Sequence, residues 1–323
     1  MATDYIARYI TSQTMTHDGR KLFESYSYQL WRIEEDAAYR TDVTGELDRH
    51  SPVDGEHLLT TLQKRYPRLE FSELKLPPGE YYPRMARPQV TSEVHITYHP
   101  TDSKIAESPG YNPDPDLEFS SHSRVRSTGQ LHALIQELDQ ICRVVHPFGD
   151  NLQAYGHSIR NLLKLAFMEV EAHWKAILRA NEYPRDEDKL NTNDYVKLLK
   201  VLRLDEFVVS LNYYPWLKPI SPFVCWSENP ATKSLSWYDA YNSTKHDREL
   251  NFQEATLRRA LAAITGCFVM LSAQYGLAFA VQGKRAEREF FRLIRAPTWH
   301  PSEYYVNQGS PVAKPYFRQA PTA

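Results

Sequence analysis

The sequence predicts an α+β protein that is mainly helical. Three observations predict this class. Aromatic-rich segments in the first hundred residues alternate with period two, as strands do. Proline, glycine and serine then accumulate over residues 100–128, and beyond them apolar residues recur with the helical period. We therefore expect a small α+β domain at residues 1–120, an up-and-down helical bundle at 121–295 and a proline-rich C-terminal tail at 296–323.

The N-terminal domain is expected to contain two strands and two helices. Residues 22–33 and 93–99 alternate large apolar side chains with other residues, which predicts strands. In residues 55–66 leucines recur at helical spacing. Residues 3–12 repeat a tyrosine–isoleucine pair four positions apart, which predicts a helix with one apolar face. This domain is either a packing partner for the bundle or a recognition module for a partner protein.

The bundle is expected to hold long helices. Apolar stripes predict one helix over 131–145 and a second, of about thirty residues, from residue 152. The second helix must end before Pro184, because proline cannot continue a helix. A short helix is predicted from residue 193, and the last long helix is predicted from Phe252.

One uncharged segment of that last helix, residues 261–281, has about the length that spans a membrane. Two interpretations are open, a membrane span and a buried central helix of the bundle. Polar side chains dilute the segment at Thr265, Ser272 and Gln274, and the segment continues an amphipathic helix. These features favour the buried helix, so we expect no membrane partner.

Composition and missing motifs exclude several classes of function. The formal net charge is −2, so no global basic field favours nucleic acid. Three cysteines lie far apart, which disfavours a disulfide framework or a zinc site and favours reduced thiols in the cytoplasm. The first residues lack the apolar core of a signal peptide. Phosphate-binding glycine loops and the GxSxG and HExxH motifs do not occur, so we expect no cofactor and no metal.

The candidate site lies on a helix predicted over residues 237–248 and opened by Ser236. Its sequence is WYDAYNSTKHDR. A packed aromatic edge, formed by the i, i+4 pair of Trp237 and Tyr241, is expected to anchor this helix in the core. The polar face carries Asp239, Asn242 and His246 at i, i+3 and i+7, with Lys245 one turn from Asn242.

This polar face suits phosphodiester chemistry. His246 can act as general acid or base near neutral pH, and Asn242 can orient a hydroxyl group. Lys245 can stabilise phosphate charge. The alternative is a solvated helix face on which His246 and Asp239 only form hydrogen bonds.

A second polar group lies on the long helix. Glu169 and His173 have the i, i+4 spacing of metal ligands, but two ligands are too few, and His157 is the nearest further candidate. The alternative is a buried polar pair. Glu169 and Glu171 could instead face the helix of residues 237–248 and hold its lysine or histidine.

Three stretches of the second half resemble a known family. They are HSIRNLLKLAFMEVEAHWKAIL, NDYVKL, and WYDAYNSTKHDR followed by ATLRRALAAITGCFVML. These stretches are similar to HEPN-like helical bundles, a group named from higher eukaryotes and prokaryotes nucleotide-binding. The pattern YNxxKHxR is also that of uncharacterised bacterial proteins. The resemblance covers about residues 151–276.

The resemblance implies a homodimeric bundle whose family motif is an arginine, four to six residues, and a histidine. His246 matches the motif histidine, and Asn242 matches the polar residue that commonly follows the arginine. This sequence departs from the motif, because Tyr241 stands at the nearest arginine spacing. Tyrosine supplies no permanent cation, so Lys245 or Arg248 would have to stabilise the phosphate.

The resemblance therefore implies a cytoplasmic HEPN-like protein of bacterial defence, toxin–antitoxin or stress-response systems. Its implied activity is metal-independent RNA cleavage, with Arg248, Tyr241, Asp239, Glu169 and Glu171 in supporting positions. The alternative is a non-catalytic module with a degenerate motif that binds RNA or nucleotide or assembles with a protein. RNA, a second copy of the chain and a partner of the N-terminal domain are the implied partners.

Overall fold

A computed structural model describes residues 2–15, 17–19, 21–42, 45–53, 56–90, 93–98, 104–107, 117–246, 248–276, 289–306 and 311–318. The chain forms two compact units, each described here by itself. The first unit comprises residues 1–81, 87–115 and 298–314. The second comprises residues 82–86, 116–297 and 315–323. Taken together, the two units make the protein α+β and mainly helical. Each unit consists of more than one segment of the chain.

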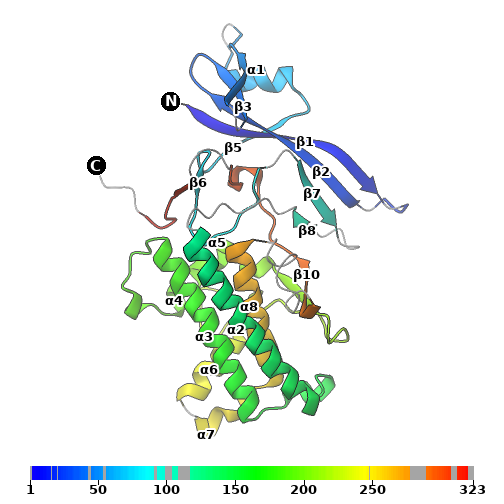
Figure 1. The fold of residues 1–323 in the computed structure, drawn as a ribbon, viewed down its shortest axis with the longest axis vertical. Helices are drawn as coiled ribbons and strands as arrows, with labels where there is room; N and C mark the ends of the chain where they lie inside the picture. Colours follow the sequence, from blue (N-terminus) through cyan, green and yellow to red (C-terminus); the bar gives the residue numbers. More distant parts are fainter. Residues whose placement is uncertain are drawn as a thin grey trace. The chain divides into compact units, whose positions relative to one another are not determined.

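The first unit is built on an antiparallel sheet around the long hairpin of β1 and β2 (Figure 1). The strands follow the order β4-β3-β2-β1-β5, and β7 also pairs with β2 and carries β8. Their bounds are β1 Thr3–Met15, β2 Lys21–Ile33, β3 Ala38–Asp42, β4 Gly45–His50, β5 Glu70–Glu73, β7 Glu93–Tyr98 and β8 Lys104–Glu107. The predicted strands at 22–33 and 93–99 are confirmed.

The prediction of a helix over residues 3–12 is wrong, because this segment is strand β1. Ile6 and Ala7 are adjacent and both completely buried, yet they belong to two different apolar clusters. Both faces of the sheet are therefore covered at this point. A strand buried on both faces loses the period-two alternation, so its pattern cannot be told from that of a short helix.

The two faces of the sheet are covered by different elements. Helix α1, Leu58–Arg65, buries Leu58 and Leu62 in one cluster with Trp31 of β2, which confirms the predicted helix at 55–66. The other cluster joins Tyr28 of β2 to Tyr304. Part of the C-terminal tail is paired, since β11, Val312–Ala313, runs parallel to β6, Glu80–Tyr81.

The second unit is a group of helices in which α3 packs against α2, α6 and α8 (Figure 1). The main helices are α2 Leu117–Val144, α3 His157–Ala180, α6 Ser236–His246 and α8 Leu257–Tyr275. Short elements complete it: α4 Thr192–Tyr195, α5 Lys197–Leu202, α7 Arg248–Asn251, β9 Val208–Leu211 and β10 Phe291–Arg295. One continuous apolar cluster joins these helices.

Helix boundaries differ from the predicted ones where the apolar stripe fades. Helix α2 begins at Leu117, inside the segment expected to be a linker. The prediction missed its first turns because they are rich in serine and carry few apolar residues. Helix α3 has 24 residues and begins at His157, and a separate 3-10 turn, Gly149–Gln153, precedes it. Helix α8 begins at Leu257, where the side chain of Thr256 caps it. The apolar period alone therefore does not locate the ends of these helices.

The uncharged segment forms the buried helix α8. Every residue from Ala263 to Gln274 is buried. Helix α8 ends at Tyr275, and residues 277–281 of the predicted segment lie outside the described residues. Within the described part of the chain, no helix is both long enough and apolar enough to cross a membrane.

Candidate functional site

A pocket of about 600 Å³ opens beside α6, between α3 and the segment that forms α4. It lies entirely within the helical unit. Its lining residues are Phe167, Glu171, Leu190, Asn191, Thr192, Tyr195, Thr232, Tyr238, Asp239, Tyr241, Asn242, Ser243, Lys245 and Asn251. Such a volume suits a small molecule or one nucleotide unit.

The aromatic edge of α6 orients this helix. The helix begins at Ser236, the residue predicted to open it, and Trp237 is buried immediately afterwards. The indole N–H of Trp237 donates to the carbonyl oxygen of Pro222 at 2.9 Å. Ala240 is also buried, so the opposite side of the helix turns Asn242 and Lys245 toward the pocket.

Aromatic rings form one wall of the pocket. The rings of Phe167 and Tyr241 stack with centroids 3.7 Å apart, and Tyr238 lies 4.6 Å from Phe167. Burial raises the pKa of Tyr238 to about 12, and hydrogen bonds with Thr192 and Asn242 act in the opposite direction. Burial, followed by the charge of Glu171, also raises the pKa of Tyr241. Both hydroxyl groups therefore stay protonated at neutral pH and can donate hydrogen bonds.

The α4 wall is held by a buried carboxylate. Asp194 accepts two hydrogen bonds from Arg185 Nη1, at 3.0 and 3.1 Å, and one from the backbone N–H of Asn191 at 2.9 Å. Asn191 in turn caps α4. Thr192 and Thr232 meet through their hydroxyl groups at 3.0 Å. These contacts give the polar wall a defined shape.

The charges in the pocket favour a neutral or amino-bearing ligand group over a buried phosphate. Glu171 forms an ion pair with Lys175 at 3.0 Å and accepts a hydrogen bond from Tyr195 at 3.2 Å. Asp239 adds a second carboxylate, and Lys245 is exposed at the rim. Two carboxylates thus face one ammonium group among the lining residues that the structure describes.

The structure brings together five of the residues that the sequence singled out. Asp239, Tyr241, Asn242, Lys245 and Glu171 all line the pocket. The backbone of α6 ends at His246, and α7 begins at Arg248. The side chains of His246 and Arg248 lie outside the described part of the structure.

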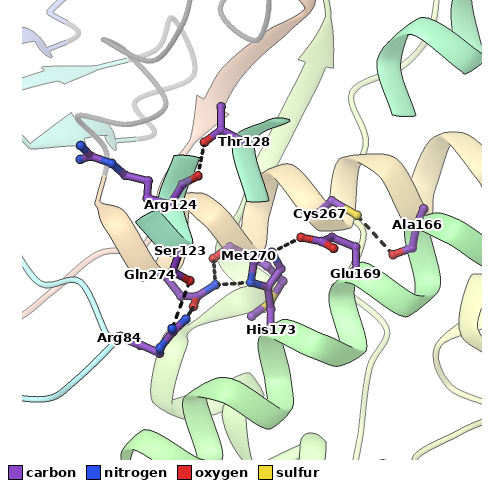
Figure 2. Close-up of polar contacts among 10 residues, drawn as sticks. All are labelled: Arg84, Ser123, Arg124, Thr128, Ala166, Glu169, His173, Cys267, Met270 and Gln274. Atoms are coloured by element: carbon purple, nitrogen blue, oxygen red, sulfur yellow. Dashed lines mark hydrogen bonds and ion pairs between the residues drawn. The ribbon is translucent and has the colours of Figure 1, made fainter. Parts of the chain in front are cut away.

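Glu169 points to a different place, a buried polar network (Figure 2). Its Oε1 lies 3.3 Å from His173 Nε2. Gln274 Nε2 is 2.9 Å from His173 Nδ1 and donates to the carbonyl oxygen of Met270, while Gln274 Oε1 accepts from Arg84. With Nδ1 accepting, the ring proton of His173 sits on Nε2, toward Glu169.

This network matches the alternative of a buried polar pair at Glu169 and His173. His173 Nε2 and Glu169 Oε1 lie within ion-pair distance, but their geometry does not form a hydrogen bond. His157, the third candidate ligand, packs its ring on Phe252. Among the described residues, no group of three or more histidine, cysteine or acidic side chains could hold a metal ion.

Sequence reasoning missed much of the pocket wall. Phe167 and Tyr195 lie in the apolar stripes of their own helices, and Thr192 lies just before the short helix predicted from residue 193. Tyr238 occupies a buried position in α6 and still lines the pocket. The tyrosine hydroxyl groups are the signal that could have indicated this pocket. A buried tyrosine usually directs its hydroxyl group toward a cavity or a hydrogen-bond partner.

Comparison of the chain with protein-family models, with curated proteins and with solved structures found no match. Its function is therefore inferred from the pocket and from the motif residues that the pocket collects.

Proposed function

We propose that the pocket beside α6 binds single-stranded RNA, in a helical unit of the HEPN-like kind. The observation that carries this proposal is the combination of an aromatic wall with an exposed lysine at the rim of one polar pocket. Bases of single-stranded RNA stack on aromatic side chains, and the phosphates of the same strand pair with basic ones. Tyr241 and Lys245 offer these two kinds of contact on consecutive turns of α6.

The pocket is suited to hold the base inside and the phosphate outside. A phosphate drawn between the carboxylates of Glu171 and Asp239 would be repelled. A base carries no charge and can use the hydroxyl and amide groups of Tyr238 and Asn242. Lys245, which is exposed, can meet the phosphate where solvent still screens the acidic residues.

Substitution of Lys245 by alanine is expected to weaken RNA binding for all base sequences alike. Fluorescence anisotropy with short uridine-rich oligonucleotides measures the dissociation constant at several salt concentrations. Loss of one phosphate contact should reduce the slope of log K against log salt by about 0.7. Lys233→Ala removes an exposed lysine that does not line the pocket and is expected to leave this slope unchanged. Equal slopes for the wild type and Lys245→Ala would contradict the proposed contact.

A second candidate function is metal-independent cleavage of the bound strand. It is favoured by one observation: Asn242 and Lys245 share the pocket, and His246 follows Lys245 directly at the end of α6. In this reaction His246 takes the proton of a ribose 2′-hydroxyl, whose oxygen then bonds to the adjacent phosphorus. The bond from phosphorus to the 5′-oxygen breaks, and that oxygen leaves with a proton from solvent. Lys245 stabilises the charge that develops on the phosphate.

Substitution of His246 by alanine is expected to lower the cleavage rate about 10²–10⁴-fold, the usual contribution of a general acid–base group. The assay incubates total RNA and a tRNA pool with purified full-length protein in the presence of EDTA. His122→Ala, which removes an exposed histidine of α2, is the matched control and should cleave like the wild type. Undiminished cleavage by His246→Ala would exclude this role. Absence of cleavage by folded wild-type protein would leave RNA binding as the function.

The assembly is part of the same proposal and rests on the resemblance of the α6 segment. We infer a homodimer of the helical unit, a partner protein for the sheet unit and a role in bacterial defence or stress response. Sedimentation of the full-length chain measures the first of these directly, and a monomer at all concentrations would contradict it.

A further inference from the structure

We propose that the pocket beside α6 binds guanine selectively and that the carboxylate of Asp239 recognises this base. This inference rests on the RNA-binding function proposed above and adds the identity of the base. Three observations support it: the hydrogen-bond and ion-pair partners of the two carboxylates in the pocket, the aromatic surface beside them, and the position of Lys245 at the rim.

The two carboxylates differ in their free hydrogen-bonding capacity. Glu171 is engaged by the Tyr195 hydroxyl and by Lys175. Asp239 lines the same pocket and is half-buried. Among the described residues, none forms an ion pair or a hydrogen bond with the Asp239 side chain. Because no described residue uses the hydrogen-bonding capacity of this half-buried carboxylate, Asp239 is the described pocket group that gains most from donors on a ligand.

Guanine matches a single carboxylate better than the other bases do. A carboxylate accepts two hydrogen bonds side by side through its two oxygens. The Watson–Crick edge of guanine presents two adjacent donors, the ring N1–H and the exocyclic amino group. Adenine and cytosine place an acceptor nitrogen beside their amino group, and uracil flanks its N–H with two carbonyl oxygens. In each of these three bases, at least one acceptor atom would lie against a carboxylate oxygen and be repelled by it.

The surroundings of Asp239 suit a flat base. Tyr241 stacks one face on Phe167 and remains half-buried, so part of its ring borders the pocket. Tyr241 thus offers an aromatic surface beside Asp239. Stacking on an aromatic side chain contributes to affinity for any base, and Asp239 supplies the discrimination.

The rim lysine stands at a distance that separates the base from its phosphate. Asp239 and Lys245 are six residues apart on α6, which is about 9 Å along the helix axis. This separation lets one nucleotide place its base edge near Asp239 while its backbone phosphate reaches Lys245. The two groups therefore have separable effects, base discrimination and salt-dependent affinity.

The test measures discrimination between bases with full-length protein. The probes are short oligouridine strands whose central base is guanine, adenine, cytosine, uracil or hypoxanthine. We expect the guanine strand to bind about tenfold more tightly than the uracil strand, the discrimination typical of a bidentate contact. The hypoxanthine strand lacks the amino group and should fall between them. In Asp239→Asn the ratio between guanine and uracil should approach one, because an amide offers one acceptor where the carboxylate offered two.

Asp188→Asn is the matched control, because Asp188 is an exposed aspartate of the same unit outside the pocket. It removes the same charge and should keep the wild-type ratio. Equal binding of all five strands by the wild type would overturn the guanine inference and leave RNA binding intact. Guanine preference that survives in a folded Asp239→Asn variant would also overturn it. Failure of every strand to bind would overturn the proposed function itself.

Discussion

Substitution of Trp174 by alanine is expected to lower the free energy of unfolding of the helical unit by about 3–5 kcal/mol, the usual cost of removing a large aromatic side chain from a packed core. Trp174 has no exposed surface. Its ring centroid lies 4.8 Å from that of Trp226, 5.2 Å from that of Tyr195 and 5.7 Å from that of Tyr238. The cavity left by alanine would open at the centre of this aromatic group.

The same substitution should also weaken ligand binding. Tyr195 and Tyr238 both pack against Trp174 and both line the pocket. The positions of these two tyrosines therefore depend on the Trp174 ring. Urea unfolding followed by circular dichroism gives the change in stability, and anisotropy with oligonucleotides gives the change in binding. Phe148→Ala is the control, since Phe148 is 61% exposed and should cost less than about 0.5 kcal/mol. A loss below about 1 kcal/mol for Trp174→Ala would show that the core can close around the missing ring.

The stability of the protein is expected to fall steeply as the pH rises above 10. Burial raises the pKa of Tyr238 from 10.0 to about 12, and burial also raises the pKa values of Tyr195 and Tyr304. Between pH 10 and 12 the unfolded chain releases these phenolic protons while the folded chain retains them. The folded state then binds more protons than the unfolded state, so the free energy of unfolding decreases as pH increases. Each such tyrosine contributes about 1.4 kcal/mol per pH unit in this range.

The alkaline effect can be assigned to the pocket by one variant. Tyr238→Phe removes one of the ionising groups, so its free energy of unfolding should decline less steeply between pH 10 and 12, by about 1.4 kcal/mol per pH unit. Tyr213→Phe changes a half-exposed ring and should retain the wild-type slope. Ultraviolet absorbance of the phenolate reports the ionisation itself. Ionisation of Tyr238 near pH 10 in protein that is still folded would contradict the burial on which this prediction depends.

Local patterns in the sequence determined several elements of this protein. The alternating residues of β2 and β7 predicted their strands, and the leucine spacing predicted α1. The start of α6 at Ser236 was also predicted. These features depend on neighbouring residues along the chain, because a strand or helix repeats its faces every two or every 3.6 residues.

Local patterns failed where distant contacts decide the structure. Strand β1 reads as a helix because separate clusters bury both Ile6 and Ala7, which removes the alternation. In a similar way, Glu169 and Glu171 are two residues apart on α3 and were equivalent candidates. Only packing showed that Glu171 lines the pocket and Glu169 meets His173.

For the site, the sequence by itself determined which polar residues α6 presents together, since Asp239, Asn242 and Lys245 do line one pocket. The tertiary structure alone decided what lies opposite them. Phe167 comes from α3 and Tyr195 from α4, and no spacing along the chain relates these residues to α6. The physical reason is that helical periodicity orders side chains within one helix. The pairing of helices depends on how their apolar surfaces fill a shared core, and a pattern within one segment does not contain that information.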